Sequence, residues 1–340
     1  MRVTSLLVSL VALAVLSALP GVPRSVAEEL PWHVAPVPAA PVMPAASAAP
    51  GVPAWLRAHV GDGEGQISDV VLRRARGLYL EKVREGKAKN PCYFAMDATR
   101  PAGTARRFYI ICEAQQSFRA VSSGHGNGRK LSGANFANGI RCAKNFSNAE
   151  GSKLTTGGAY WTAETRTSFK GYYWASGKRV PLLRSFLQFE GEGDTANARE
   201  RAIGGHPAVL LRNMCRRKDP KSPYADKDGY VPYGRLLNYS AGRSNGCTSW
   251  TPSASETIFE VLEDKPTTVY IYPESTDIDA VAAAVKAGKS PAREGLYWNA
   301  SCLREIGAPK FWPKETLRPI IDAYREAHPP GPERPLPLCK

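Results

Sequence analysis

The chain has 340 residues, of which seven are cysteine, and its formal net charge is +14 at pH 7. This length is enough for one large domain with a real core, or for one domain with appendages. The charge indicates a polyanionic partner, but no run of Lys and Arg is longer than Arg216–Lys218, so the chain lacks the basic stripe of a protein that follows nucleic-acid phosphates.

Residues 1–27 are predicted to be a secretory signal peptide. Arg2 provides the positive start, Leu6–Leu19 is an apolar stretch, and residues 25–27 form a small-x-small cleavage site. The apolar stretch is too short for a transmembrane helix, which needs about 20 apolar residues. An uncleaved anchor is the alternative, because the Pro-Arg pair at 23–24 makes an imperfect cleavage region.

Residues 28–60 are rich in Ala and Pro and are expected to form a stiff, extended linker. Export would place the chain in the periplasm or cell envelope. There, a cell-wall polymer or an anionic envelope surface explains the positive charge better than nucleic acid does. Solubility in a crowded envelope explains it equally well, and the sequence leaves the oligomeric state open.

Residues 61–105 are predicted to form an N-terminal helical flank. Over Gln66–Lys87 apolar residues recur at the spacing of an amphipathic helix, with Ser68 placed to cap it and Gly86 to end it. We expect this helix to pack against the following domain, and binding of a partner is the alternative.

From Arg107 onwards the apolar pattern changes to a period of two, which is typical of strands. After these strands, a capping box at Ser253–Glu256 begins a helix that Pro266 ends. Residues 276–340 are expected to form a C-terminal helical extension. The fold class is therefore predicted to be mainly β with flanking helices. The predicted strands are Phe108–Glu113 and Phe118–Ser123, which form a hairpin, Gly158–Thr162, Val180–Phe189, the short Ala202–His206 that resumes at Val209–Leu211, and Thr267–Tyr272.

The cysteine count is odd, which is informative in an exported protein, where thiols pair. One cysteine must stay free or pair outside the chain, and the six others allow fifteen connectivities. Among these we favour a Cys302–Cys339 disulfide, because both residues lie in the tail. No two cysteines have the two-to-four-residue spacing of a zinc site, so we expect no metal and no cofactor.

Cys247, in the small-residue loop Tyr239–Trp250, is the cysteine with a chemical reason to stay free. Glycine tolerates a sharp turn, so Asn245 and Gly246 can aim backbone N–H groups at one point, as an oxyanion hole requires. The downstream helix is expected to favour the thiolate and lower its pKa below about 8.5. Half of a disulfide in a turn is the alternative interpretation of a Gly-Cys pair.

Three motifs in order resemble the murein L,D-transpeptidase catalytic-domain family: Asn145–Ser152, Arg201–His206 and Arg243–Cys247. The similarity covers about Phe108–Tyr272, roughly half of the chain. It implies a catalytic domain at 106–275 with an L,D-transpeptidase-like mixed β-sandwich or barrel and a cysteine at the base of a groove.

The resemblance also implies an activity, that of a cysteine acyltransferase acting on peptidoglycan stem peptides. Such enzymes attack the carbonyl of meso-diaminopimelate in a tetrapeptide stem, release the terminal D-alanine and pass the thioester to an amine. Carried over by motif, Cys247 is the nucleophile and His206 is its base, while the N–H groups of Cys247, Gly246 and Asn245 bind the oxyanion. Ser244 is expected to orient the imidazole or a substrate carboxylate.

Substrate contacts are implied for three further residues. Arg243 is placed to clamp a stem carboxylate, because a guanidinium pairs bidentately with a carboxylate. His125, in the loop Gly124–Gly128, and Ser152 are expected on the substrate side, although a loop histidine without a task is the alternative for His125. The polar segment 212–236, between the two halves of the site, is interpreted as an insertion that acts as a specificity lid.

The chain departs from the family at two positions. Pro207 follows His206 where many related enzymes have Gly, and Asn245 stands where the broader superfamily has a histidine. Alternatives to transpeptidation are an L,D-carboxypeptidase, a hydrolase of existing cross-links, or a non-catalytic wall-binding protein in which Cys247 is structural.

Overall fold

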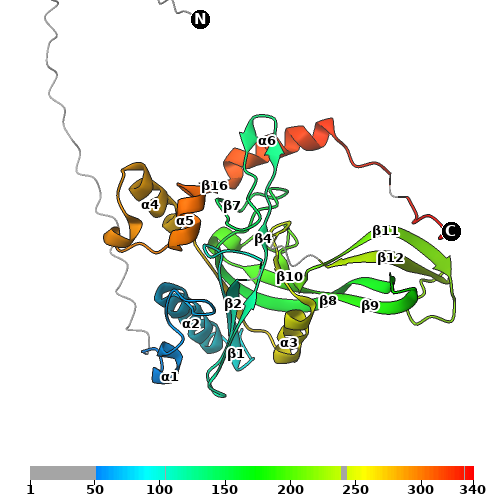
Figure 1. Cartoon of the computed structure of the whole chain (residues 1–340), viewed down its shortest axis with the longest axis horizontal. Helices are drawn as coiled ribbons and strands as arrows, with labels where there is room; N and C mark the ends of the chain where they lie inside the picture. The colour runs from blue at the N-terminus through cyan, green and yellow to red at the C-terminus, as the bar shows by residue number, and fades with distance from the viewer. Residues whose placement is uncertain (1–50, 104, 239–242, 333) are drawn as a thin grey trace, which may run out of the picture. The chain divides into compact units, whose positions relative to one another are not determined.

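The computed structural model describes residues 51–103, 105–238, 243–332 and 334–340, all within one compact unit, Ala49–Lys340 (Figure 1). The predicted signal peptide and most of the predicted linker at 28–60 lie outside the described residues. Across the described ranges, every helix is too short or too polar to span a bilayer.

The secondary structure agrees with the mainly β prediction, since strands make up 34% and helices 25%. The described helices are α1 Ala54–Arg57, α2 Asp69–Arg84, α3 Pro252–Leu262, α4 Ser275–Lys286, α5 Ala300–Ile306 and α6 Lys314–Ala327, with 3-10 helices η1 Gly193–Thr195 and η2 Pro291–Glu294. The described strands are β1 Cys92–Asp97, β2 Arg106–Cys112, β3 Ser117–Ser122, β4 His125–Gly126, β5 Lys130–Leu131, β6 Ala134–Asn135, β7 Asn145–Ser147, β8 Gly158–Ala175, β9 Lys178–Gly191, β10 Gly204–Pro207, β11 Val209–Lys218, β12 Tyr230–Asn238, β13 Arg243–Ser244, β14 Thr248–Trp250, β15 Thr268–Tyr272 and β16 Lys310–Trp312.

A ten-stranded mixed sheet organises the described residues. Its main path runs β14-β10-β9-β8-β15-β1-β2-β3, and β12 joins it through β8 and carries β11. The predicted hairpin is confirmed as β2 and β3, β8 is much longer than predicted, and β9 extends by two residues at each end. The predicted strand at Thr267–Tyr272 is β15, which inserts parallel to β1 in the middle of the sheet.

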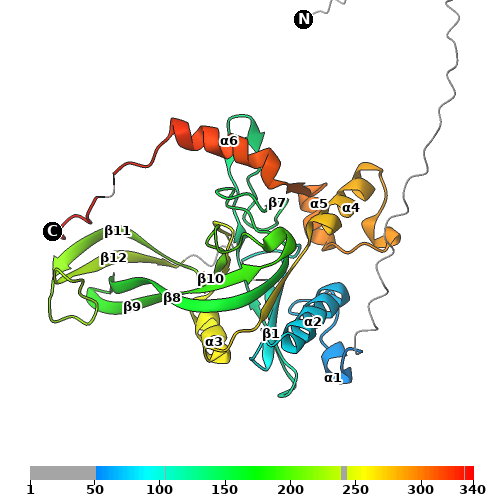
Figure 2. The same ribbon diagram turned by 180° about the vertical axis from the view of Figure 1, so that it is seen from behind.

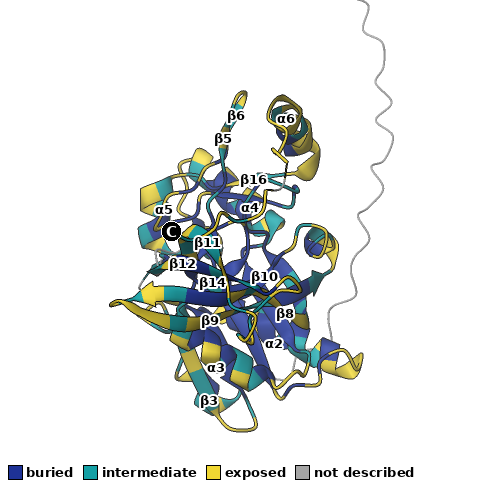
Figure 3. Cartoon of the chain, turned by 90° about the vertical axis from the view of Figure 1, so that its right-hand side faces the viewer, coloured by how far each residue is buried: buried dark blue, intermediate teal, exposed yellow. Residues whose placement is uncertain are grey.

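Both faces of the central strands are buried, because helices cover them (Figures 1 and 2). In β1, Tyr93 packs on the side of α2, whereas its neighbour Phe94 packs on the side of α3 and α4. This alternation is the period of two expected of a strand, with apolar residues on both faces. Figure 3 shows the resulting buried layer in the central strands and along α2.

The helix predicted at Gln66–Lys87 is confirmed as α2. It packs on β1 and β15, as expected, and Ser68 occupies the N-cap position without a capping hydrogen bond from its side chain. The downstream helix α3 is also confirmed, but its cap is Thr251, whose hydroxyl accepts from the N–H of Ala254 at 3.2 Å. A proline at the first helical position, Pro252, favours this earlier start over the predicted capping box.

The strands of the sheet structure extend beyond the expected start of the catalytic domain at residue 106. Strand β1 lies in the predicted helical flank at 61–105, yet it pairs with β2 on one side and β15 on the other. At the other end, β16 of the predicted helical extension pairs with β7. The predicted flank and extension therefore contribute strands to the sheet structure of the body.

The segment 212–236, interpreted from the sequence as a polar insertion, is largely β structure, because β11 and β12 form an antiparallel hairpin through most of it. Tyr233 of β12 pairs in register with Tyr172 of β8, and the two rings stack at 5.3 Å. This β structure is not evident from the sequence, because charged residues occupy exposed strand positions. The segment therefore lacks a clear alternation of apolar and polar residues.

The disulfides also correct the sequence analysis. All seven cysteines are described, and six of them form Cys92–Cys112, Cys142–Cys302 and Cys215–Cys339. The predicted Cys302–Cys339 pair is therefore wrong: α5 lies against the segment before β7, and the C-terminal end lies along β11, where Arg216 bridges to Leu338. Cys247 is free, as predicted. Three disulfides are compatible with an oxidising, exported location.

Candidate functional site around Cys247

The Cys247 loop and the His206 strand meet at one end of the large sheet. Strands β10 and β14 are parallel neighbours, and His206 pairs in register with Ser249, two residues after Cys247. The chain between them forms β11 and β12 and then returns to the same edge. The two motifs separated by the hairpin are thus brought together, as the sequence analysis expected.

Two glycines before His206 are required by close packing. A Cβ at Gly205 would lie 1.9 Å from the indole of Trp250, and one at Gly204 would lie 2.1 Å from the carbonyl oxygen of Leu187. Neither position has room for a side chain. Trp250 is itself almost fully buried, so the Gly-Gly pair lets β10 lie directly against β14 and fixes the backbone that carries His206.

The Cys247 loop is held by hydrogen bonds of its own residues. Ser244 donates from its hydroxyl to the carbonyl of Cys247 and accepts from the N–H of Gly246 at 3.1 Å. Gly246 has a φ of 115°, which favours glycine. This arrangement corrects two expectations: Ser244 braces the loop instead of orienting the imidazole, and the Gly246 N–H is engaged within the loop instead of facing an oxyanion.

Cys247 is a buried, neutral thiol. Its Sγ donates to the carbonyl of Ala202 at 3.4 Å. Burial raises the pKa of the thiol, although backbone N–H groups of Gly204 and Cys247 and the charges of Arg201 and Arg184 act in the opposite direction. The expected low-pKa thiolate is therefore wrong in direction, because loss of solvation on burial outweighs these groups.

His206 is neutral at pH 7. Burial, together with the charge of Arg184, lowers the pKa of His206 to about 4, and a hydrogen bond with the Pro207 carbonyl acts in the opposite direction. Nδ1 lies 2.9 Å from a guanidinium nitrogen of Arg184 and 2.9 Å from the carbonyl oxygen of Pro207. A neutral imidazole retains one nitrogen lone pair, which is the state a general base needs.

A pocket of about 770 Å³ joins these residues. Arg184 and Arg201 give it positive charge beside the thiol, and β11 provides an apolar wall. Its lining residues are Asn127, Ser168, Phe169, Arg184, Phe186, Arg201, Ala202, His206, Val209, Leu210, Leu211, Met214, Ser244, Asn245 and Cys247. Although Cys247 and His206 share this pocket, no hydrogen bond joins their side chains in the described structure.

Two predicted substrate-side residues lie away from the pocket. His125 is fully buried, with Nδ1 2.9 Å from Arg107 and Nε2 3.1 Å from the carbonyl of Gly139. Ser152 is also fully buried and accepts from the N–H of Leu154 at 3.3 Å. Neither side chain lines the pocket of Cys247, so the structure does not bring these two residues together with Cys247 and His206.

The remaining predicted residues lie in the loop. Asn245 is exposed and lines the pocket. The backbone of Arg243 pairs in parallel with His125, which links the loop to β4, and its side chain lies outside the described residues. Buried His125 therefore has a structural task, which is to anchor the strand beside the Cys247 loop.

The two arginines of the pocket, Arg184 and Arg201, were not predicted as site residues. Arg201 is in a quoted motif but was given no role, although it donates to the carbonyl of Leu154 at 2.7 Å and to the hydroxyl of Thr156. Arg184 lies in the middle of β9, where its neighbours in sequence gave no sign of a site. Only the pairing of β9 with β10 places it beside His206.

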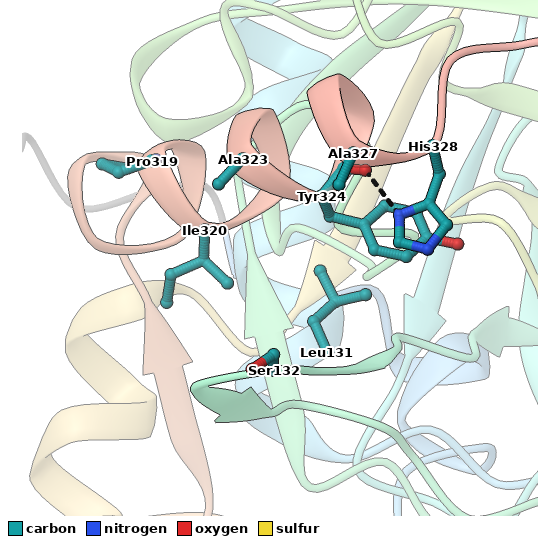
Figure 4. A pocket seen from close by; sticks show the side chains of 8 residues that line it. All are labelled: Leu131, Ser132, Pro319, Ile320, Ala323, Tyr324, Ala327 and His328. Carbon is teal, nitrogen blue, oxygen red and sulfur yellow. Dashed lines mark hydrogen bonds between the residues drawn. The ribbon is translucent and has the colours of Figure 1, made fainter.

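A second pocket of about 440 Å³ lies between β5 and α6 (Figure 4). Its walls are mainly apolar and include Leu131 and Ile320. Tyr324 and His328 close one end, with stacked rings 4.4 Å apart and a hydrogen bond from His328 Nδ1 to the Tyr324 carbonyl. Among the described residues that line it there is no cysteine and no acidic side chain.

Within the described ranges, no group of three or more His, Cys, Asp and Glu side chains is arranged to hold a metal ion. The site around Cys247 is therefore described by its own side chains and backbone. Comparisons of the chain with protein-family models, with curated proteins and with solved structures found no match.

Proposed function

We propose that the protein is an exported cysteine acyltransferase that acts on peptidoglycan stem peptides and resembles the L,D-transpeptidases. The observation that carries the proposal is the free thiol of Cys247, which shares one pocket with a neutral histidine and two arginines. Six other cysteines are paired, so Cys247 is the free thiol of the described chain. The L,D-transpeptidase-like fold is part of the same proposal.

The chemistry begins with two neutral groups. His206 takes the proton of Cys247 as the sulfur attacks the meso-diaminopimelate carbonyl, which forms the C–S bond and an oxyanion. The imidazolium then returns that proton to the leaving D-alanine amine as the C–N bond breaks, leaving a thioester. An amine acceptor repeats these steps in reverse and frees the thiol. The low pKa of His206 keeps it in the base form before each proton transfer.

Oxyanion binding is assigned to one of the expected donors, the N–H of Cys247, together with the N–H of Gly204. The backbone N–H groups of Gly204 and Cys247 act to lower the pKa of the thiol and so favour a negative charge on the sulfur. They are therefore our candidates for the oxyanion hole, since a carbonyl carbon bonded to that sulfur holds its oxygen close to the same donors.

The positive charge of the pocket supports a negatively charged acyl donor as substrate. Stem peptides carry several carboxylates, and Arg184 and Arg201 both line the pocket. The wall from Val209 to Met214 adds apolar surface that can contact the aliphatic part of a diaminopimelate side chain. The net charge of +14 is in keeping with an anionic polymer as partner.

A non-catalytic wall-binding protein is the second candidate, and one observation favours it. The thiol of Cys247 is buried and bonded to the Ala202 carbonyl, which is also how an inert structural cysteine lies. In that case the basic pocket binds stem carboxylates and no thioester forms.

Incubation with purified tetrapeptide muropeptides separates these candidates. With an amine acceptor, a transpeptidase releases D-alanine and yields cross-linked dimers, whereas a carboxypeptidase yields tripeptides with water as acceptor. Binding of the muropeptide without D-alanine release by the folded protein would support the non-catalytic candidate and contradict the proposal.

A further inference from the structure

Two groups compete for one nitrogen of His206. The guanidinium nitrogen Nη2 of Arg184 and the carbonyl oxygen of Pro207 each lie 2.9 Å from Nδ1. Arginine only donates hydrogen bonds and a carbonyl only accepts them. A neutral imidazole nitrogen either holds a lone pair or carries a proton, so Nδ1 can satisfy only one of these neighbours at a time.

The hydrogen bond that Nδ1 makes determines whether the other ring nitrogen, Nε2, carries the proton or a lone pair. When Arg184 donates to Nδ1, the ring proton is on Nε2, and Nε2 cannot accept the proton of Cys247. When Nδ1–H donates to Pro207, Nε2 holds the lone pair that a base needs. The arginine-bonded tautomer is therefore inactive as a base, and the carbonyl-bonded tautomer is active.

We propose that Arg184 is a positioning residue that binds a carboxylate of the acyl donor and, by leaving Nδ1, selects the base-competent tautomer of His206. This inference rests on the proposed function. The ring proton moves from Nε2 to Nδ1 through solvent, so the imidazole stays neutral and no proton is gained or lost. The base then becomes available only when an acidic substrate is in the pocket.

The position of Arg184 suits this role better than that of Arg201. Arg201 donates to Thr156 and to the carbonyl of Leu154, so both of its terminal nitrogens hold the segment after β7 in place. Arg184 is half-buried on β9, contacts Ser168 through Nη1 at 3.3 Å, and lines the pocket with Cys247. A carboxylate binds a guanidinium more strongly than a neutral imidazole nitrogen does, because the bond is charge-assisted and bidentate.

The arrangement also accounts for a substrate preference. Without a carboxylate, the positive charge of Arg184 faces the ring on which the proton must arrive. With one, that charge is neutralised and the imidazolium formed during acylation is stabilised. The inferred specificity is for acyl donors that place a carboxylate within reach of Arg184 on β9. The carboxylate that pairs with Arg184 is either that of the terminal D-alanine or a side carboxylate of the stem.

The tautomer can be observed directly by 15N NMR of the His206 ring in the mature protein. N-acetyl-D-alanine is the probe, and N-acetyl-D-alanine amide is its uncharged match. We expect the free protein to show the Nε2–H tautomer and the acid, but not the amide, to shift the population toward Nδ1–H. A ring that keeps the same tautomer at saturating acid, or that responds equally to the amide, overturns the proposal.

Alkylation of Cys247 provides a second readout that needs no stem peptide. Iodoacetate carries a carboxylate and iodoacetamide is nearly isosteric without it. We expect Arg184→Gln to lower the ratio of the two alkylation rates by about tenfold or more, the usual weight of a charge-assisted hydrogen bond. Arg184→Lys should restore part of the ratio. Arg179→Gln, on the same strand and bonded to Asp219, is the matched control and should leave it unchanged.

An unchanged ratio in folded Arg184→Gln contradicts the inference. The proposed function is judged separately, by D-alanine release from tetrapeptide. A protein that shows the carboxylate-dependent tautomer and alkylation but releases no D-alanine loses the transpeptidase assignment, whereas one that releases D-alanine equally well with Arg184→Gln loses only the role of Arg184. Stem peptides amidated either at the terminal carboxylate or at a side carboxylate then identify which of these two carboxylates Arg184 binds.

Discussion

Gly205 lies directly against the indole of Trp250, so a Cβ at that position would be only 1.9 Å from the ring. Because His206 follows Gly205 and Trp250 ends the strand after Cys247, this single contact joins the two halves of the site. The fit of β10 against β14 is therefore a packing feature that also holds His206 and Cys247 close to each other in the fold.

Replacing Gly205 with alanine tests that contact. The methyl group has no room beside Trp250, so we expect the free energy of unfolding to fall by about 1–3 kcal/mol or more, with loss of activity as β10 shifts. Gly77→Ala in α2 is the matched control: nothing lies within 4 Å of the new methyl group, and alanine favours the helix by about 0.5–1 kcal/mol. Denaturant unfolding of both variants measures the difference. Equal stability of the two would contradict the packing described.

The two buried histidines are expected to respond differently to substitution. His206→Gln should lower the acylation rate by about 10²–10⁴-fold, the usual share of a general base, with little change in stability at pH 7. His125→Ala leaves the buried Arg107 without a bonding partner at Nη2, so it should cost about 1–3 kcal/mol of stability. Single-turnover kinetics and thermal melts distinguish the outcomes. If His125→Ala slows acylation in a fully folded protein while His206→Gln does not, the roles are reversed.

The depressed pKa of His206 makes stability depend on pH. The unfolded histidine titrates at about 6.5 and the folded one at about 4, so the unfolded state binds more protons between these values. The stabilisation is fully present above pH 6.5 and is lost as the pH falls toward 4, by about 3 kcal/mol. Because the two proteins are expected to be about equally stable at pH 7, the unfolding free energy of the parent should fall below that of His206→Gln as the pH is lowered from 7 to 4. Parallel curves would show that the ring is not buried in its neutral form.

Disulfide mapping of the unreduced protein should give Cys92–Cys112, Cys142–Cys302 and Cys215–Cys339, with alkylation only at Cys247 and only slowly, because its pKa is raised. Cys142 and Cys302 are 160 positions apart, so opening this bridge by a double alanine substitution should cost about 2–5 kcal/mol. A rapid label on Cys247 at pH 6 would instead indicate the low-pKa thiolate that the sequence analysis expected.

Patterns of apolar residues in the sequence predicted those helices and strands that bury one regular face. The apolar spacing of α2 and the alternation of β2 and β3 are visible in the sequence because each element buries a regular face. The β11–β12 hairpin was missed because its strands carry Arg and Lys at exposed positions, and its apolar support comes from Tyr172 of a distant strand. The true disulfides likewise follow from strand and helix placement, which spacing in the tail does not indicate.

The residues of the candidate site were also predicted only in part. Motif order identified Cys247 and His206, and the structure places both on one pocket. Arg184 was not identified, since it lies at no motif and reaches His206 only through the pairing of β9 and β10. The ionisation of Cys247 was predicted in the wrong direction, because loss of solvation on burial outweighs the groups that favour the thiolate.

The central claim is that Cys247 becomes acylated by a tetrapeptide stem. Intact-mass analysis of the mature protein incubated with a purified tetrapeptide donor, without an acceptor amine, tests this most directly, and a carbapenem serves as a second acyl donor. On Cys247, located by peptide mapping, we predict an adduct of the tetrapeptide minus D-alanine, or an adduct of the whole ring-opened carbapenem, and none on folded Cys247→Ala or Cys247→Ser. Absence of any adduct from either donor on folded protein with a free Cys247, or an adduct that persists in Cys247→Ala, would contradict the account.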